Sequence, residues 1–252
     1  MGGVAIVYRD ADKNFGKINV FTNAVELNTV IQKVEMLTKK NVDEIMLNRG
    51  QYRFSDKIYQ DNPNEMKRIS DRRISTNAFK NLPELFTNEA PNNGYEYARI
   101  LGLVDNERVY KYFKREYLLE PHSFEQYKVF ISKANGAALK NGTIVGTPLV
   151  ADKGVGATET FITIGGFDER IEAENLSTYI KTKFARAMLS VLKVTADNTK
   201  EKWAKVPLQD FTAQSDIDWS KPIPEIDKQL YAKYGLDDNE ITFIEEKVTA
   251  MG

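Results

Sequence analysis

The chain has 252 residues, 42% of them hydrophobic and 28% charged, as in an ordinary globular protein with a sizeable core. It contains no cysteine and one histidine, His122, which excludes disulfides and argues against a cysteine- or histidine-built metal site. The net charge of -1 lacks the basic excess of many nucleic-acid binders, and no apolar run approaches the roughly 20 residues of a membrane span. With no recognisable signal peptide, we expect a cytoplasmic protein without a metal and without membrane contact.

The N-terminal third predicts a hairpin, a helix and a long irregular connection. Short apolar runs at residues 3–8 and 18–21 flank a polar loop, which is typical of a β-hairpin. From Val25 to Leu37 the apolar residues recur at helical spacing. Residues 40–93 mix aromatic, polar and proline residues, so we expect loops and short helices there.

The middle of the chain predicts a run of strands. We expect them within residues 97–104, 108–118, 127–136, 143–150 and 158–167. The first two flank a hairpin turn at Asp105-Asn106-Glu107, and the third ends in the turn Lys133-Ala134-Asn135-Gly136. A glycine-rich loop at Asp152–Ala157 separates the last two. Because helices follow these strands as a group, the sequence predicts an α+β fold with antiparallel or mixed sheets.

A long amphipathic helix is predicted in the first half of the stretch from Asp168 to Phe211. Its apolar face comprises Leu176, Ile180, Phe184, Ala187, Met188 and Val191. A second stripe at three- and four-residue spacing comprises Tyr179, Lys183, Arg186, Ser190 and Lys193. This stripe is either solvated surface or a face that binds a partner.

The C-terminal segment predicts further helices, which we expect to form a packing appendage. Pro207 suits the first turn of a short helix, and Pro222 or Pro224 opens a helix that Gly235 ends. A last helix is expected from Asp237 or Asp238 to near Val248. Trp219 and Tyr231 are expected to be core anchors.

No set of catalytic residues is found in the sequence. The loop at Asp152–Ala157 lacks the Gly-Lys-Ser/Thr of a phosphate-binding loop, and Glu245-Glu246-Lys247 lies in a predicted helix and not on a nuclease strand. Asn62-Pro63 is not followed by a second proline, and a single histidine cannot supply a Ser-His-Asp triad.

The sequence YIKTKFARAMLSVLKVTADNTKEKWAKVPLQDFT at residues 179–212, continuing through residues 215–248, resembles a known family. The similarity is to the C-terminal target-recognition (TaqI-like specificity) region of Eco57I-like type II adenine-specific DNA methyltransferases and restriction-modification enzymes. It implies a DNA-binding region whose partners are double-stranded DNA and a methyltransferase catalytic domain or subunit. S-adenosylmethionine would bind the parent enzyme, and we expect no cofactor in this chain.

The resemblance also implies a division of the chain into three parts. Residues 1–40 would be a hairpin and helix that close the catalytic domain, residues 41–205 the specificity domain, and residues 206–252 the helical appendage. Two alternatives stay open: a self-sufficient endonuclease or other enzyme with an unrecognised motif, and an assembly module that does not bind DNA.

The candidate DNA-binding residues are basic, amide and tyrosine side chains, namely Lys111, Lys114, Arg115, Lys133, Asn135, Tyr179, Lys183 and Arg186. Lysine and arginine suit phosphates, whereas Lys133 and Asn135 have the chemistry for guanine and adenine edges. Asn135 in its glycine-adjacent turn is otherwise a structural residue. Thr158–Thr160 is expected to touch DNA or to cap a strand.

Overall fold

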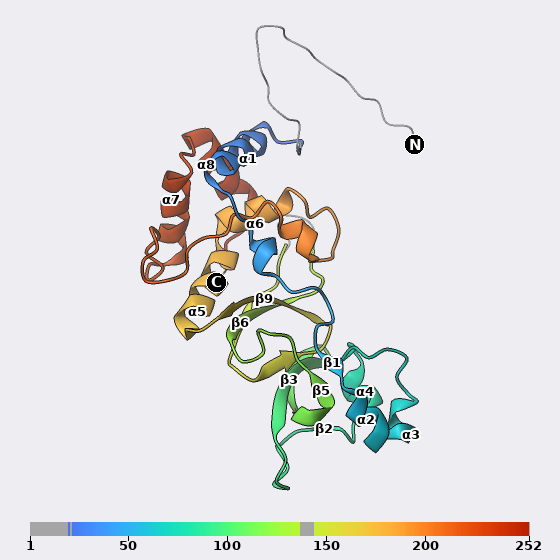
Figure 1. Cartoon of the computed structure of the whole chain (residues 1–252). Coiled ribbons are helices and arrows are strands. Elements are labelled where there is room, and N and C mark those ends of the chain that lie inside the picture. Colours follow the sequence, from blue (N-terminus) through green and yellow to red (C-terminus); the bar gives the residue numbers. More distant parts are fainter. Residues whose placement is uncertain (1–19, 21, 137–143, 252) are drawn as a thin grey trace, which may run out of the picture.

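The computed structural model of the chain describes residues 20, 22–136 and 144–251. It is an elongated α+β molecule in which a helical end and a β-rich end meet across a sheet (Figure 1). The α+β prediction is therefore confirmed. The predicted hairpin at residues 3–8 and 18–21 lies, except for Val20, outside the described residues.

Helices occupy both ends of the molecule. The helical end contains α1 (Val25–Leu37), η1 (Val42–Ile45), α5 (Arg170–Lys181), α6 (Lys183–Ser190), η3 (Lys200–Trp203), α7 (Ile223–Lys233) and α8 (Asp238–Lys247). The β-rich end contains the short helices α2 (Asp56–Asp61), α3 (Pro63–Met66), α4 (Ala78–Asn81) and η2 (Arg115–Tyr117).

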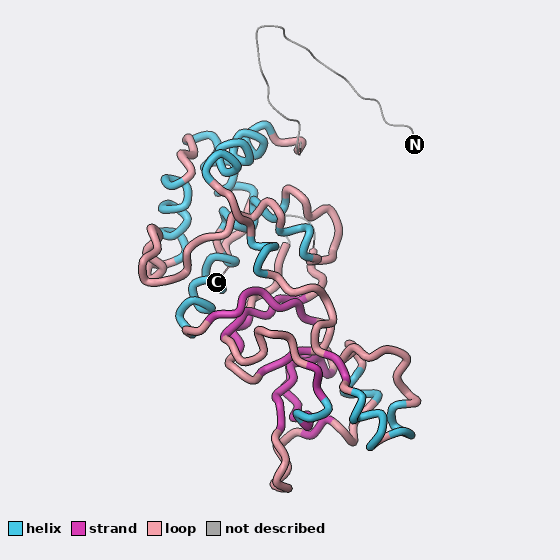
Figure 2. Tube along the Cα trace, viewed as in Figure 1, coloured by secondary structure: helices cyan, strands magenta, loops and turns pink. Residues whose placement is uncertain are grey.

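The strands form three small sheets (Figure 2). They are β1 (Arg53–Phe54), β2 (Phe86–Thr87), β3 (Tyr97–Val104), β4 (Glu107–Lys114), β5 (Leu118–Leu119), β6 (Tyr127–Ser132), β7 (Leu149–Ala151), β8 (Val155–Ala157) and β9 (Phe161–Phe167). The sheet orders are β1-β5, β2-β4-β3-β8 and β7-β6-β9, and β3 with β8 is the parallel pair.

The sheet β7-β6-β9 is the wall between two hydrophobic cores. Successive side chains of a strand point to opposite faces. Val129 and Ile131 therefore belong to the core of the helical end, whereas Phe130 between them belongs to the core of the β-rich end. The second core also holds Phe86 and Phe113, whose rings stack with centroids 4.6 Å apart.

The helical core draws on all three predicted segments of the chain. Val34 of α1, Phe184 of α6 and Ile244 of α8 are buried in the same cluster. Trp219 and Tyr231 are buried there too, as predicted. The predicted boundaries near residues 40 and 205 therefore do not divide the packing, and residues 206–252 are an integral part of the core.

Several local predictions are confirmed. Helix α1 spans the predicted residues, and Asp105 and Asn106 adopt positive φ angles of 50° and 66° in the predicted hairpin turn. Gly235, with φ of 61°, follows α7, and Asp237 caps α8 in a reciprocal capping box with Glu240.

Three local predictions are wrong. The long helix is interrupted at Thr182, whose extended backbone and hydroxyl cap a new helix, α6. The glycine-rich loop is shorter than expected, because Val155–Ala157 pairs with β3 as strand β8. Pro207 opens no helix and instead forms an isolated bridge with Asn41.

Within the described ranges, no helix combines the length and the apolar character needed to cross a membrane.

The shared core predicts a large stability effect from the last helix. Ile244 is fully buried, so Ile244→Ala should lower the free energy of unfolding by about 2–5 kcal/mol through lost burial and a cavity. Ile171→Ala is the matched control, since Ile171 is 55% exposed. Denaturant unfolding of both variants measures this, and equal midpoints would contradict the placement of α8 in the core.

Candidate nucleic-acid interface

The turn Lys133–Gly136 lies at the junction of the two cores, directly after β6. The loop that follows α6 runs antiparallel to it. The backbone N–H of Asn135 donates to the carbonyl of Ala196, and the N–H of Asn198 donates to the carbonyl of Lys133, both at 2.8 Å. The structure thus places the predicted turn on a backbone support.

Two buried polar side chains add to this support. The Nδ2 atom of Asn198 donates to the carbonyl of Ser132 and to Oδ1 of Asn135, both at 2.9 Å. The Nζ atom of Lys193 donates to the carbonyls of Gly136 at 3.0 Å and Ile144 at 2.6 Å. Burial lowers the pKa of Lys193 to about 8.

Lys133 and Lys111, both predicted site residues, come close to α4. The Nζ atom of Lys133 donates to Oγ1 of Thr76 at 3.1 Å. Thr76 in turn lines a hollow of about 380 Å³, whose polar lining residues also include Asn77, Lys80, Asp105 and Lys111. Thr76 therefore connects Lys133 with a hollow that contains Lys80 and Lys111.

Arg108 extends this basic region to the other face of the β3–β4 hairpin. It lies opposite Leu103 in the register, whereas Lys111 lies opposite Ile100, so the two cations leave opposite faces. Arg108 donates to the carbonyl of Thr147 at 2.8 Å. This set of residues, which includes side chains on both faces of the hairpin, is called the junction face: Thr76, Asn77, Lys80, Arg108, Lys111, Lys133 and Asn135.

The cations of the junction face differ from most other cations of the β-rich end in their partners. Among the described residues, Lys80, Arg108, Lys111 and Lys133 have no carboxylate within 4.0 Å. By contrast, the cations that do form ion pairs with acids are Arg49, Lys57, Arg68, Arg72, Arg73, Lys114 and Arg115. The junction face thus carries cations that form no ion pair with a described carboxylate, and Asp105 is an acid that lines its hollow.

Lys114 and Arg115, also predicted site residues, lie at the opposite end of β4 from the hairpin turn. Lys114 pairs with Glu116, and its ammonium lies 3.2 Å from the centroid of the Tyr95 ring. Arg115 pairs with Glu120 at 3.1 Å and with Glu125. The structure does not join these two cations to the junction face.

The predicted stripe on the long helix is wrong as a surface feature. Tyr179 and Arg186 are buried, Tyr179 donating its hydroxyl to the carbonyl of Pro207 at 2.7 Å. Arg186 donates to the carbonyls of Thr182 and Thr249, and burial lowers its pKa. Lys183 pairs with Glu245.

The physical reason is the interruption at Thr182 together with the last two helices. Both helices pack on α6 and cover the side that would otherwise face solvent. Lys193 is buried as well, and Ser190 donates to the carbonyl of Ala187. The predicted apolar face, in contrast, is confirmed, since Leu176, Ile180, Phe184, Ala187, Met188 and Val191 are all buried.

Residues 158–160 connect strand β8 of the four-stranded sheet to strand β9 of the three-stranded sheet. Their side chains do not cap a strand. Their backbone pairs with neighbouring segments, Thr158 donating to the carbonyl of Leu101 and Glu159 to that of Ile74, both at 2.8 Å. The hydroxyls of Thr158 and Thr160 are buried without a hydrogen-bond partner among the described residues. Glu159 pairs with Arg49 and Arg73.

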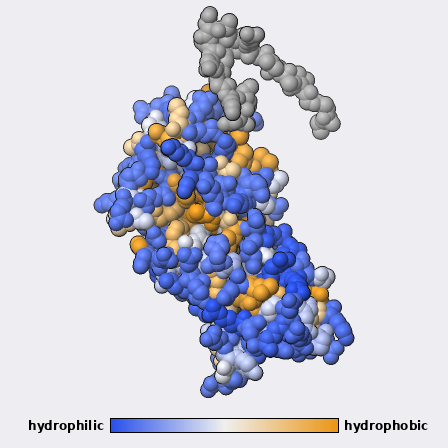
Figure 3. Space-filling view, viewed as in Figure 1, coloured by the Kyte–Doolittle hydropathy of each residue, from blue (hydrophilic) through white to orange (hydrophobic). Residues whose placement is uncertain are grey.

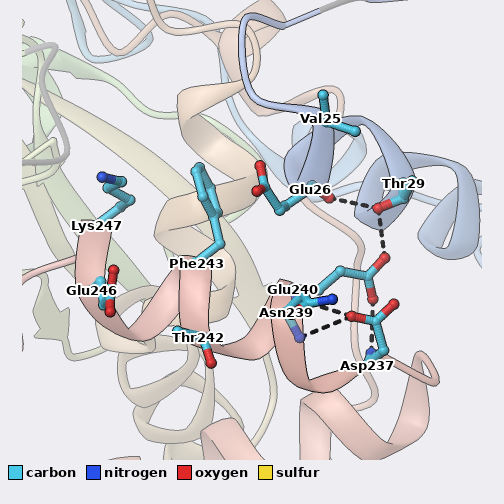
Figure 4. A pocket seen from close by; sticks show the side chains of 10 residues that line it. All are labelled: Val25, Glu26, Thr29, Asp237, Asn239, Glu240, Thr242, Phe243, Glu246 and Lys247. Atoms are coloured by element: carbon cyan, nitrogen blue, oxygen red, sulfur yellow. Dashed lines mark hydrogen bonds between the residues drawn. The ribbon is translucent and has the colours of Figure 1, made fainter.

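A second hollow, of about 520 Å³, lies between α1 and α8 and has the wrong charge for nucleic acid (Figure 4). Its acidic lining residues are Glu26, Asp237, Glu240 and Glu246. Glu240 is held by Thr29 and Lys33, each at 2.6 Å. Four carboxylates would repel phosphates, so this hollow is excluded as a nucleic-acid site.

No group of three or more potential metal-ligating side chains is present in the part of the chain that the structure describes. No protein-family model matches the sequence, and no curated protein matches it significantly. The chemistry of the junction face therefore has to be judged from its own residues.

Sequence reasoning missed several residues of this region. Thr76, Asn77 and Lys80 lie in residues 40–93, where no periodic pattern singled out any side chain. Asn198 lies within the stretch that carries the family resemblance, but a resemblance assigns no contact to it. Arg108 was part of a predicted strand, and its lack of an acidic partner is a tertiary property.

The start of α6 predicts a pH dependence of stability. The carboxylate of Asp227 accepts the backbone N–H groups of Lys183 at 3.1 Å and Phe184 at 2.9 Å. Burial nevertheless raises the pKa of Asp227 from 3.8 to about 6. The folded protein therefore holds a proton between pH 4 and 6 that the unfolded chain releases.

The proton on Asp227 contributes roughly 2–3 kcal/mol to the free energy of unfolding. This contribution is fully present below about pH 3.8 and is lost as the pH rises through 6. Asp227→Asn should flatten this part of the stability profile. The control is Asp238→Asn at an exposed carboxylate of α8. Unfolding free energies at pH 4, 5, 6 and 7 test it, and a profile unchanged by Asp227→Asn would refute the assignment.

Proposed function

We propose that the chain is the DNA target-recognition region of a type II restriction-modification adenine-N6 methyltransferase. In this proposal the junction face binds duplex DNA and positions it for a catalytic domain or subunit that binds S-adenosylmethionine. The chain acts in the cytoplasm and takes no part in the chemical step.

The observation that carries the proposal is the set of unneutralised cations. An ion pair largely cancels the field of its cation, so Arg115 or Arg73 offers little to a phosphate. Lys80, Arg108, Lys111 and Lys133 are different, because no carboxylate of the described residues lies within 4.0 Å of them, and Asp105 lines the hollow beside Lys80 and Lys111 without pairing with either. Such cations bind phosphates and release counterions from DNA. Because most acids that pair with cations of the β-rich end lie away from these four residues, a chain of net charge -1 can still present a basic face.

The sequence resemblance supports the same proposal from a different direction. It covers nearly the whole chain and is weakest at residues 40–82. Part of its clearest stretch, residues 179–248, supports the turn Lys133–Gly136 directly, through Ala196 and Asn198. The segment that resembles a specificity domain is thus in contact with the residues best suited to read DNA. The buried remainder of the segment supplies the helical core on which this support rests.

The proposal predicts a change in salt dependence. Replacing Lys80, Arg108 and Lys111 by Ala removes about three phosphate contacts from the junction face. Binding to a mixed-sequence 30-base-pair duplex should weaken, and the slope of log affinity against log salt should become shallower by about 2.7, from roughly 0.9 per contact. Fluorescence anisotropy across a salt series measures both quantities.

A charge-matched control replaces Lys39, Lys40 and Lys247, which lie at the helical end. This triple variant should retain the wild-type slope. If the two triple variants behave alike, or if the wild-type protein does not bind the duplex, the junction face is not a DNA-binding surface.

A further inference from the structure

The carboxamide of Asn135 is held in one orientation by a chain of hydrogen bonds. The carbonyl of Ser132 is only an acceptor, so the group of Asn198 that faces it at 2.9 Å must be the NH2 group. The second hydrogen of that NH2 group points to the side chain of Asn135, also at 2.9 Å. The atom of Asn135 that receives it must therefore be Oδ1.

This orientation leaves Asn135 with its NH2 group available. No described residue accepts a hydrogen bond from its Nδ2 atom, and that atom is not among the buried atoms that lack a partner. Nδ2 lies above Gly146, where an added Cβ would come within 2.9 Å of it. The NH2 group therefore packs against the backbone of Gly146 on this side, and a glycine at that position leaves room for the carboxamide in this orientation.

Lys133 offers the same kind of group. Its ammonium donates one hydrogen bond to Thr76 and has two further hydrogens without an acceptor among the described residues. The turn thus presents donors from both side chains. An asparagine that reads adenine uses Oδ1 and Nδ2 together, whereas the edge of guanine in the major groove offers two acceptors, N7 and O6.

We propose that Asn198 is a positioning residue that fixes the carboxamide of Asn135, so that the Lys133–Asn135 turn reads guanine and not adenine. The inference rests on the proposed DNA binding and states which base the Lys133–Asn135 turn selects. It also narrows the expectation that Lys133 and Asn135 contact guanine and adenine edges, because two donors match the two acceptors of guanine, whereas adenine presents one acceptor and one donor.

The test replaces the hydrogen-bond donor of Asn135 by an acceptor without changing the shape of the side chain. Asn135→Asp keeps an oxygen for Asn198 and turns the free NH2 group into an acceptor. Wild-type protein and variant are each incubated with 30-base-pair duplexes that carry 14 randomised central pairs, and the retained duplexes are sequenced. Asn239→Asp, at an exposed residue of α8, is the control that adds the same charge.

We expect the wild-type protein and Asn239→Asp to enrich the same site, with guanine at one position that Asn135 contacts. Asn135→Asp should lose that guanine by about 10-fold or more and favour cytosine or adenine there, whose major-groove edges carry an amino group. The other positions of the site should be unchanged.

A second measurement uses the duplex that wild-type protein selects. Replacing the guanine by 7-deazaguanine removes N7 and should weaken wild-type binding by about 10-fold, with little effect on Asn135→Asp. Asn198→Ala should reduce discrimination between guanine and adenine at this position alone, at unchanged affinity for an unrelated duplex.

Two outcomes would overturn the inference while leaving DNA binding intact. One is that Asn135→Asp selects the wild-type site, which would mean that Asn135 contacts no base. The other is that it weakens every duplex equally, which would mean a phosphate contact. If wild-type protein retains no duplex above background, the proposed function fails as well, and this result is distinct from the other two.

Discussion

Two buried ammonium groups, one from Lys128 near the start of β6 and one from Lys193 beyond its end, hold the junction between the cores together. Lys128 donates to the carbonyls of Phe124, Gln126 and Asp152 at 2.9–3.1 Å. Lys193 does the same beyond the other end of the strand, with carbonyls on both sides of residues 137–143. Each lysine thus joins two chain segments that lie just beyond the ends of strands.

Each buried ammonium stabilises the fold only when all of its carbonyl acceptors are in place. Transfer of an ammonium from water costs several kcal/mol, and it is offset only where charge-assisted hydrogen bonds replace the lost hydration. Burial lowers the pKa of both lysines to about 8, which shows that the offset is partial. Such groups specify one arrangement of the backbone, because any other arrangement leaves a charge without partners. The Lys133–Gly136 turn therefore has a fixed backbone, as the proposed reading of base edges requires.

The elements set by local sequence were predictable, and those set by tertiary contacts were not. Spacing was enough for α1, and turn chemistry was enough for Asp105-Asn106 and Gly235, since backbone preference decides there. The stripe on the long helix failed for the opposite reason. Tyr179 and Arg186 look like surface residues on a helical wheel, but a capping hydroxyl at Thr182 and two later helices bury them. Residue spacing carries no information about which side a distant segment will cover.

The candidate site shows the same limit for charge. From the sequence, Lys111, Lys114 and Arg115 were predicted to contact phosphates and Lys133 a base edge, but a sequence does not show which cation has an acidic neighbour. The fold separates them by what lies next to each one: Glu116 beside Lys114 and Glu120 beside Arg115, but Thr76 beside Lys133 and Asn88 beside Lys111. A cation bound to a neutral oxygen keeps its charge for an external anion, whereas one bound to a carboxylate does not. Whether a cation can bind an external anion therefore depends on the group next to it, and that neighbour is set by the fold and not by the local sequence.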